Sequence, residues 1–417
     1  MALPILLARK QEGGAIRKRA FIPVALWVAF IIIALLNPSH VIGEQGWQPL
    51  ASWKPWLPTT PDTARTETAA LPWFAALMLG GMLMACQPSR RHTRLIWSAI
   101  ALNGFVLAAV GAGFHFIGAT KLLGILPAPE SYFFATFFYK NHWAAYGALC
   151  ASAGLALALE AWPHMLRGLP RARGRVFFYG STALLTLVTL PLPGSRSGLL
   201  LAVCLLLGAS VAALWILVRE SGKSIRIRWQ PLMAVFVIGL AIVGYGILAY
   251  GKTGTQDFAR TQRQIEDAKK IEDVEMRLLL SRDTWHMAKQ RPWFGWGSGS
   301  FEIVFPVFQG DYLRDADGRT TARFQEAHND WLQQMAETGL TGLLILLVPL
   351  VITGFSAWHR GGLAARWALG ACGLLLLYAL IDFPLHNLAV LILLTVLWTT
   401  AGRLGESRNQ PHNKPDR

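Results

Sequence analysis

Histidines, arginines and acids at the edges of long apolar runs are the residues of this chain best suited to chemistry. The stretch EAHNDWLQQMAETGLTGLLILLVPL, residues 326–350, sets His328 directly before a run of the length of a membrane span. Near neutral pH an imidazole can take a proton from an attacking hydroxyl, so His328 is a candidate general base. Asn329 or Asp330 is expected to begin the next helix by accepting from a free backbone N–H. The alternative is a histidine that only makes hydrogen bonds at an interface.

Three arginines lie next to apolar segments. LPGSRSGLL places Arg196 in a short turn between two apolar runs, and EMRLLLSRDTW supplies Arg277 and Arg282. A turn needs Pro, Gly and Ser but no guanidinium, and a charge beside a membrane is a functional candidate by default. Because a guanidinium can bind two phosphate oxygens at once, these arginines are candidate phosphate ligands. Contact with lipid headgroups is the alternative for Arg196, and a solvated helix face is the alternative for the other two.

Two further polar groups lie at the ends of apolar runs. FFYKNHWAAYG carries Lys140, Asn141 and His142, and LIDFPLHN carries Asp382 and His386. A carboxylate at a membrane edge costs free energy unless it is paired, so Asp382 is expected to orient an arginine or a histidine.

Neither a nucleotide loop nor a metal site is indicated. The glycine run at residues 295–299 lacks the Lys and Ser/Thr of a Walker loop, so a turn is expected there. His, Cys and carboxylate residues show no zinc-ligand spacing, and we expect no metal and no cofactor.

The elements that position these residues belong to a membrane protein. The 417-residue chain is 53% hydrophobic and only 15% charged, which is typical of a polytopic membrane protein. Ten apolar stretches are candidate spans: Phe21–Leu36, Leu71–Cys86, Leu95–Ile117, Trp143–Leu159, Val176–Leu192, Leu199–Val218, Leu232–Tyr250, Leu340–Trp358, Trp367–Ile381 and Phe383–Ala401. The four cysteines Cys86, Cys150, Cys204 and Cys372 fall inside them, so no disulfide framework is expected.

The net charge of +15 is read as an orientation signal. Arg17, Lys18 and Arg19 precede the first span, and the short loops that lie on the same side are basic. The positive-inside rule then places both termini in the cytoplasm, and nucleic acid is not an expected partner.

This topology predicts an all-α polytopic protein with about 10–12 transmembrane helices and one large, mainly helical periplasmic loop. Residues 1–250 would form helices 1–7, residues 251–339 the loop with the candidate histidine, and residues 340–417 the last helices and a cytoplasmic tail.

Between Gln256 and Arg291 there is neither Gly nor Pro, and apolar residues recur at helical spacing, namely Phe258, Ile265, Ala268, Ile271, Val274 and Leu278. One or two amphipathic helices on the membrane surface are expected there. Three tryptophans of the external segment 37–70, Trp47, Trp53 and Trp56, are expected at the headgroup level.

Five motifs occur in an order that resembles a known superfamily. They are FFYKNHWAAYG, GSRSG, the segment from Arg277 to PWFGWGSGSF, AHNDWLQQMAETGLTG and LIDFPL, and they span roughly residues 134–388. Together they resemble the bacterial O-antigen ligases and O-antigen polymerases, a superfamily that includes protein O-oligosaccharyltransferases. The resemblance implies a metal-independent glycosyltransferase of the GT-C type. Such enzymes take a glycan from undecaprenyl pyrophosphate at the periplasmic face of the inner membrane.

Carried over to this chain, the resemblance implies that His328, Arg196 and Arg277 are the catalytic residues. Substrate contacts are expected from the remaining polar residues of the motifs, namely Arg282, Lys140, Asn141, His142, Asn329, Asp382 and His386. The first expectation is an inverting O-antigen ligase that transfers the glycan to the lipid A core oligosaccharide. The alternatives are a polysaccharide polymerase with the same donor and a lipid-linked glycan acceptor, a protein O-oligosaccharyltransferase, and a membrane transporter. A transporter would place charges near the bilayer midplane, whereas here they gather at one face.

Overall fold

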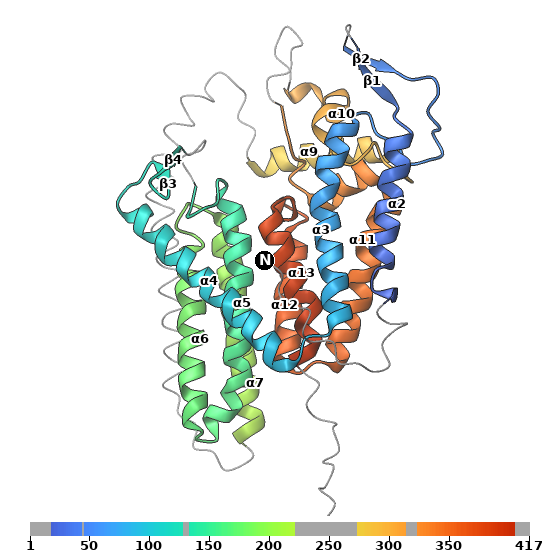
Figure 1. Cartoon of the computed structure of the whole chain (residues 1–417). Helices are drawn as coiled ribbons and strands as arrows, with labels where there is room; N and C mark the ends of the chain where they lie inside the picture. The colour runs from blue at the N-terminus through green and yellow to red at the C-terminus, as the bar shows by residue number, and fades with distance from the viewer. Residues whose placement is uncertain (1–17, 44–45, 128–132, 222–272, 314–322, 405–417) are drawn as a thin grey trace, which may run out of the picture. The chain divides into compact units, whose positions relative to one another are not determined.

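The computed structural model describes residues 18–43, 46–127, 133–221, 273–313 and 323–404 (Figure 1). Most of these residues are helical, as predicted for an all-α membrane protein. The α-helices are α2 Ile22–Leu36, α3 Thr63–Cys86, α4 Arg90–Phe116, α5 Lys140–Leu166, α6 Pro170–Thr189, α7 Arg196–Ser221, α9 Asp273–Gln290, α10 Phe301–Phe308, α11 Asp330–Arg360, α12 Leu363–Tyr378 and α13 Leu388–Thr400. Short 3₁₀ turns are η1 Asp311–Leu313, η2 Pro384–His386 and η3 Ala401–Leu404.

Nine of the ten predicted spans fall on described helices, and the tenth, Leu232–Tyr250, lies outside the described residues. In the described part of the chain, α3, α4, α5, α7 and α11 are long and apolar enough to cross a membrane. The apolar helices α2, α12 and α13 are shorter. The last helix begins at Leu388 and not at Phe383, because η2 comes first and the side chain of Asn387 accepts from the N–H groups of Ala389 and Val390.

Short strands that the sequence did not predict occur in two segments that connect helices. Strands β1 His40–Gly43 and β2 Gly46–Pro49 pair antiparallel, with Val41 opposite Gln48. Strands β3 Lys121–Leu122 and β4 Leu126–Pro127 form a smaller antiparallel pair. Of the three tryptophans expected at the membrane surface, Trp56 is exposed, whereas the ring of Trp53 lies 4.5 Å from the guanidinium carbon of Arg291.

The chain divides into two compact units. Unit 1 comprises Met1–Gln87, Lys270–Gly354 and Leu375–Thr399, and unit 2 comprises Pro88–Lys269, Phe355–Leu374 and Thr400–Arg417. Each unit therefore combines segments that are distant in sequence, whereas the predicted segments 1–250, 251–339 and 340–417 follow the chain order.

Unit 2 is built around α5, which packs against α4, α6 and α7. Most of α5 is buried, and its surface carries many small residues. Gly104 of α4 lies so close to Cys150 of α5 that any side chain at residue 104 would collide with it. Small residues at such contacts let the backbones of membrane helices approach closely.

In unit 1, α9 and α10 lie at one end of α3 and α11 (Figure 1). The predicted loop helix is confirmed for the part covered by α9, and the expected apolar residues before Asp273 lie outside the described residues. Leu280, Met287 and Ala288 of α9 pack with Phe301 and Phe305 of α10, and Ala327 and Ala336 belong to the same core. Leu278 points away from this core and is exposed. The core thus fixes the residue that immediately precedes His328.

Candidate active site

His328 lies in the turn that leads into α11. The side-chain oxygen of Asn329 accepts from the N–H of Leu332 at 3.0 Å, so Asn329 caps the helix and that prediction is confirmed. His328 has a φ of +52°, in the left-handed region that residues with a Cβ rarely adopt. Its side chain is 24% exposed, which leaves the imidazole partly open to a reactant.

Asp382, in the connection between α12 and α13, is the carboxylate beside His328. Its Oδ1 lies 3.7 Å from Nδ1 of His328, and its Oδ2 lies 3.6 Å from a guanidinium nitrogen of Arg277. Arg277 also donates to the carbonyl of Ile381 at 2.6 Å. Asp382 therefore pairs with both a histidine and an arginine, which is the kind of pairing that the sequence led us to expect. The distance to His328 exceeds a hydrogen bond, and such contacts often shorten only when substrate binds.

The environment of Asp382 favours its charged form. Its side chain is only 1% exposed, and burial acts to raise its pKa. His328, Tyr378 and Arg277 outweigh this effect and hold the pKa of Asp382 below its ordinary value. Tyr378 donates to Oδ2 at 2.6 Å, and the N–H of Phe383 donates to Oδ1 at 2.9 Å. Asp382 is thus an anion that holds an imidazole on one side and a guanidinium on the other.

A second histidine–carboxylate pair lies in the same part of unit 1. Nδ1 of His386 is 2.5 Å from Oδ1 of Asp330, and Nε2 of His386 is 3.2 Å from Oε2 of Glu326. Burial acts to lower the pKa of His386, but Asp330, Glu326 and Glu337 raise it to about 9. His386 is therefore a cation at neutral pH, and its charge offsets the buried carboxylate of Asp330.

The glycine run is a turn, as predicted, and four of its five backbone N–H groups donate hydrogen bonds within the protein. Gly295, Gly297 and Gly299 all have positive φ. The carboxylate of Glu337 accepts from the N–H of Gly299 at 2.7 Å and from that of Phe301 at 3.2 Å. The loop therefore holds an internal carboxylate of α11, which disfavours a phosphate site there.

Arg282 does not join the group around Asp382 in the described structure. Its side chain is 56% exposed, and its Nε donates to the neighbouring Asp283 at 3.1 Å. Asp283 is buried and also accepts from the N–H of Gly310 and the hydroxyl of Tyr312. The structure therefore separates Arg277, which contacts Asp382, from Arg282, which contacts Asp283.

Unit 2 contains the other predicted site residues. Arg196 is the exposed first residue of α7, and Lys140, Asn141 and His142 form the first turn of α5. Asn141 is buried, and its side-chain oxygen accepts from the hydroxyl of Ser195 at 2.7 Å. Ser195 in turn accepts from the N–H of Gly198 at 2.9 Å. These bonds fix the start of α7, and thus the backbone of Arg196, against the start of α5.

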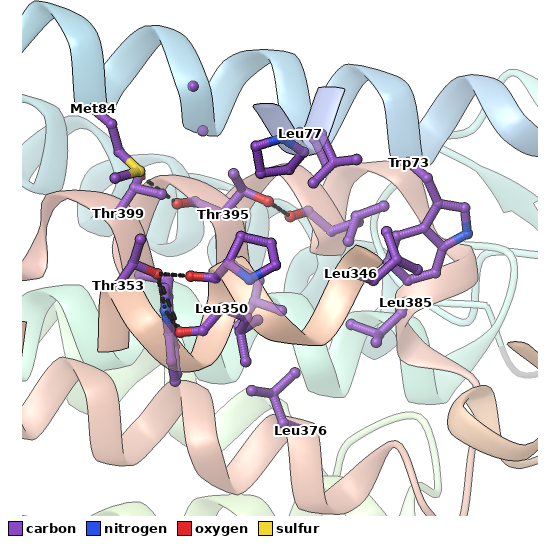
Figure 2. Close-up of a pocket in the computed structure, with 18 of the residues that line it drawn as sticks. Trp73, Leu77, Met84, Leu346, Leu350, Thr353, Leu376, Leu385, Thr395 and Thr399 are labelled. Carbon is purple, nitrogen blue, oxygen red and sulfur yellow. Dashed lines mark hydrogen bonds between the residues drawn. The ribbon is translucent and has the colours of Figure 1, made fainter. Parts of the chain in front are cut away.

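Unit 1 also contains an apolar pocket that Leu385, the neighbour of His386 in sequence, helps to line. Trp73 and Leu77 of α3 and Leu346 and Leu350 of α11 form other parts of its wall, and Thr353, Thr395 and Thr399 are among the few polar contributors (Figure 2). The N–H of Leu385 donates to Asp330 at 2.8 Å. The pocket is suited to a hydrocarbon chain, and Leu385 connects its wall to the second histidine pair.

The site contains residues that the sequence did not identify as functional. Tyr378 was missed, although its spacing of four residues from Asp382 at a helix end is a usable signal. The pairing of Asp330 and Glu326 with His386 joins segments more than fifty residues apart, and nothing in the local sequence indicates it. Within the described residues, no three His, Cys, Asp or Glu side chains form a group able to hold a metal ion.

Comparison with known families gives a match to part of the chain. Residues 181–347 match the family described as O-antigen ligase. The match includes Arg196, Arg277, Arg282, His328 and Asn329, and it ends before Asp382 and His386. Among proteins with curated descriptions, none matches the chain.

Proposed function

We propose that this membrane enzyme is an O-antigen ligase, because residues 181–347 match the O-antigen ligase family, which supports the superfamily resemblance of the motifs. The enzyme would move a glycan from undecaprenyl pyrophosphate to the lipid A core oligosaccharide. The reaction would take place at the periplasmic face of the bacterial inner membrane, would need no metal ion and would invert the anomeric centre.

The observation that carries the proposal is the contact of Asp382 with both His328 and Arg277. A histidine held by a buried carboxylate is a familiar arrangement for a general base, because the carboxylate orients the ring and stabilises its charged form. Nδ1 of His328 faces Asp382, which leaves Nε2 for an acceptor hydroxyl.

The bond changes follow from these positions. The acceptor oxygen attacks the anomeric carbon as its proton passes to Nε2 of His328. The bond between the anomeric carbon and the phosphate oxygen breaks, and its electron pair stays on the lipid diphosphate. Attack from the face opposite the leaving group gives inversion.

The leaving diphosphate gains negative charge, and two guanidiniums are proposed to stabilise it. Arg277 lies beside the base, and Arg196 begins α7. Fixed cations in a partly dehydrated site stabilise a developing anion without reorganisation of solvent. Lys140, Asn141, His142 and Arg282 are proposed to contact the diphosphate or sugars, and Asn329 and Asp382 would contribute by supporting His328.

The apolar pocket offers a place for part of a lipid chain. It is lined almost entirely by apolar side chains (Figure 2). Trp331, three residues after His328, also contributes to its wall. A lipid-linked donor needs an apolar binding site for its lipid chain close to the residue that activates the acceptor.

The test is reconstitution of the purified protein in vesicles with a glycan linked to undecaprenyl pyrophosphate. One arm offers lipid A core as the acceptor, a second offers another lipid-linked glycan, and a third offers an acceptor protein. Transfer to lipid A core alone supports the ligase. Product only in the second or third arm would assign the chain to the polymerases or to the protein-glycosylating enzymes, and flux across the membrane without transfer would identify a transporter.

A further inference from the structure

Two histidine–carboxylate pairs tie the start of α11 to the connection between α12 and α13. In one pair, His328 precedes α11 and Asp382 belongs to the connection. In the other pair the arrangement is reversed. The carboxylate, Asp330, begins α11, and the histidine, His386, belongs to the connection. We infer that His386 and Asp330 are positioning residues that fix the turn presenting His328. This inference rests on the proposed role of His328 as the base.

The turn needs such support because of its backbone. His328 has a positive φ, and a residue with a Cβ persists in that conformation only when surrounding contacts hold it. Before His328, the N–H of Ala327 donates to the side chain of Gln333 at 2.7 Å. After it, the N–H of Asp330 donates to the carbonyl of Ala379 at 2.9 Å. The turn is thus anchored on both sides.

The carboxylate of Asp330 binds the start of α11 directly to the connection between α12 and α13. One oxygen lies 2.5 Å from Nδ1 of His386, and the other accepts from the N–H of Leu385 at 2.8 Å. Asp330 is 1% exposed, so its charge has little access to water. A buried carboxylate without its cation is strongly unfavourable, and the segments would have to move to solvate it.

His386 has no ring nitrogen left for a substrate. Nδ1 is taken by Asp330, and Nε2 lies 3.2 Å from the carboxylate of Glu326. The charged groups that face the ring are Asp330 and Glu337 from α11 and Glu326 from the preceding segment. Together they raise the pKa of His386 to about 9, so the ring is a cation that the protein itself uses. His386 therefore acts through the turn, in place of the substrate contact expected from the sequence.

The test compares His386→Ala with His386→Asn in reconstituted vesicles, with wild-type protein and His286→Ala as references. His286 is an exposed histidine of α9 and makes a matched control. The Asn amide can still donate to Asp330, whereas Ala cannot. Because a small displacement of a reacting group costs about 10²-fold, His386→Ala should lower kcat by that factor with KM for the donor unchanged. His386→Asn should recover most of the loss, and His286→Ala should behave as wild type.

The kinetic constants separate positioning from general stability. A misplaced base lowers kcat at an unchanged KM in His386→Ala, whereas His286→Ala should change neither constant. Wild-type kcat in His386→Ala, a higher KM for the donor at unchanged kcat, or no recovery in His386→Asn would overturn the inference.

A measurement that does not depend on glycan transfer tests this inference separately from the proposed function. The rate at which diethylpyrocarbonate modifies His328, measured by peptide mass spectrometry, should change in His386→Ala and stay at the wild-type value in His286→Ala. An unchanged rate would overturn the inference even if all variants transfer glycan. If wild-type protein transfers no glycan, the proposed function fails while this rate still decides the positioning. Should His386→Ala not fold, Asp330→Asn must show the same change, because it keeps the side-chain shape and loses the charge.

Discussion

Asp382 connects the proposed base to the nearest proposed phosphate ligand. Asp382→Asn keeps the size of the side chain but removes the charge that His328 and Arg277 share. We expect a fall in transfer of at least about 10²-fold, since the carboxylate orients the imidazole and stabilises its charged form. Initial rates of glycan transfer in vesicles measure this effect. The exposed Glu67→Gln is the control, and a rate of Asp382→Asn equal to that of the control would remove Asp382 from the site.

His386 predicts a pH dependence of stability. Its pKa is raised from 6.5 to about 9, so the folded protein retains a proton that the unfolded chain releases between these values. The stabilisation is therefore complete below about pH 6.5 and is lost as the pH rises through about 9. The Tm of detergent-solubilised wild-type protein should exceed that of His386→Asn by about 2 °C or more at about pH 6, and the difference should shrink by about pH 9.5. A difference that does not change with pH would contradict the assigned charge of His386.

At the residue scale, the sequence indicated which residues are candidates for function better than it indicated which residues contact one another. His328, Arg277 and Asp382 stood out because a charge at the edge of an apolar run needs a reason, and the structure brings these three together. Asp330 was expected only as a possible helix start, since its partner His386 lies 56 residues away and local spacing cannot indicate such a contact.

At the scale of elements, the break in α11 at Gly339 predicts a strict requirement for glycine. Gly339 has a φ of 63° and a ψ of −172°, and a Cβ there would collide with the backbone of Trp293 and Phe294. Conformations of this kind are open essentially to glycine alone. The N–H groups of Leu340 and Thr341 just beyond the break donate to the carbonyls of Pro292 and Trp293. The break therefore locks the glycine turn against the helix that follows His328.

We expect Gly339→Ala to lower the free energy of unfolding by about 3 kcal/mol or more, because it adds a steric collision to an unfavourable conformation. The control is Gly370→Ala in α12, where a Cβ would meet nothing within 4 Å. Thermal unfolding in detergent measures both variants. Equal Tm values for the two would show that the break does not need glycine.

The elements were largely predictable because a membrane span is a long apolar run. Residues 71–86 and 95–117 are examples, and α3 and α4 cover them almost completely. The starts of these helices extend further, to Thr63 and Arg90, because Asp62 and Ser89 cap polar turns that hydropathy cannot detect. The strands at His40–Gly43 and Gly46–Pro49 are too short for a period to be read from the sequence.

At the scale of the whole molecule, the proposed orientation predicts which side of the membrane each loop reaches. After replacement of the four native cysteines by serine, Lys121→Cys should react with a membrane-impermeant maleimide in intact spheroplasts. Arg171→Cys at the start of α6 should react only after permeabilisation. Both residues are exposed in the structure. Reaction of Arg171→Cys in intact spheroplasts would reverse the orientation and remove the proposed donor from reach of His328.

The grouping of distant segments into units could not be foreseen from the sequence. Residues 375–399 belong to the same compact unit as residues 270–354, so that Asp382 reaches His328 and His386 reaches Asp330 from the far end of the chain. Such long-range packing depends on helix surfaces as a whole and not on any local pattern.

Glycan transfer by His328→Ala and Arg277→Ala, measured beside wild type in the same donor-loaded vesicles, tests the proposed chemistry. His286→Ala and Arg323→Ala are the matched controls, since both residues are exposed and belong to unit 1. We expect wild type and both controls to form product, and neither site variant to form any while both remain folded and membrane-inserted. Wild-type rates in His328→Ala or in Arg277→Ala would contradict a base and a leaving-group cation at these positions.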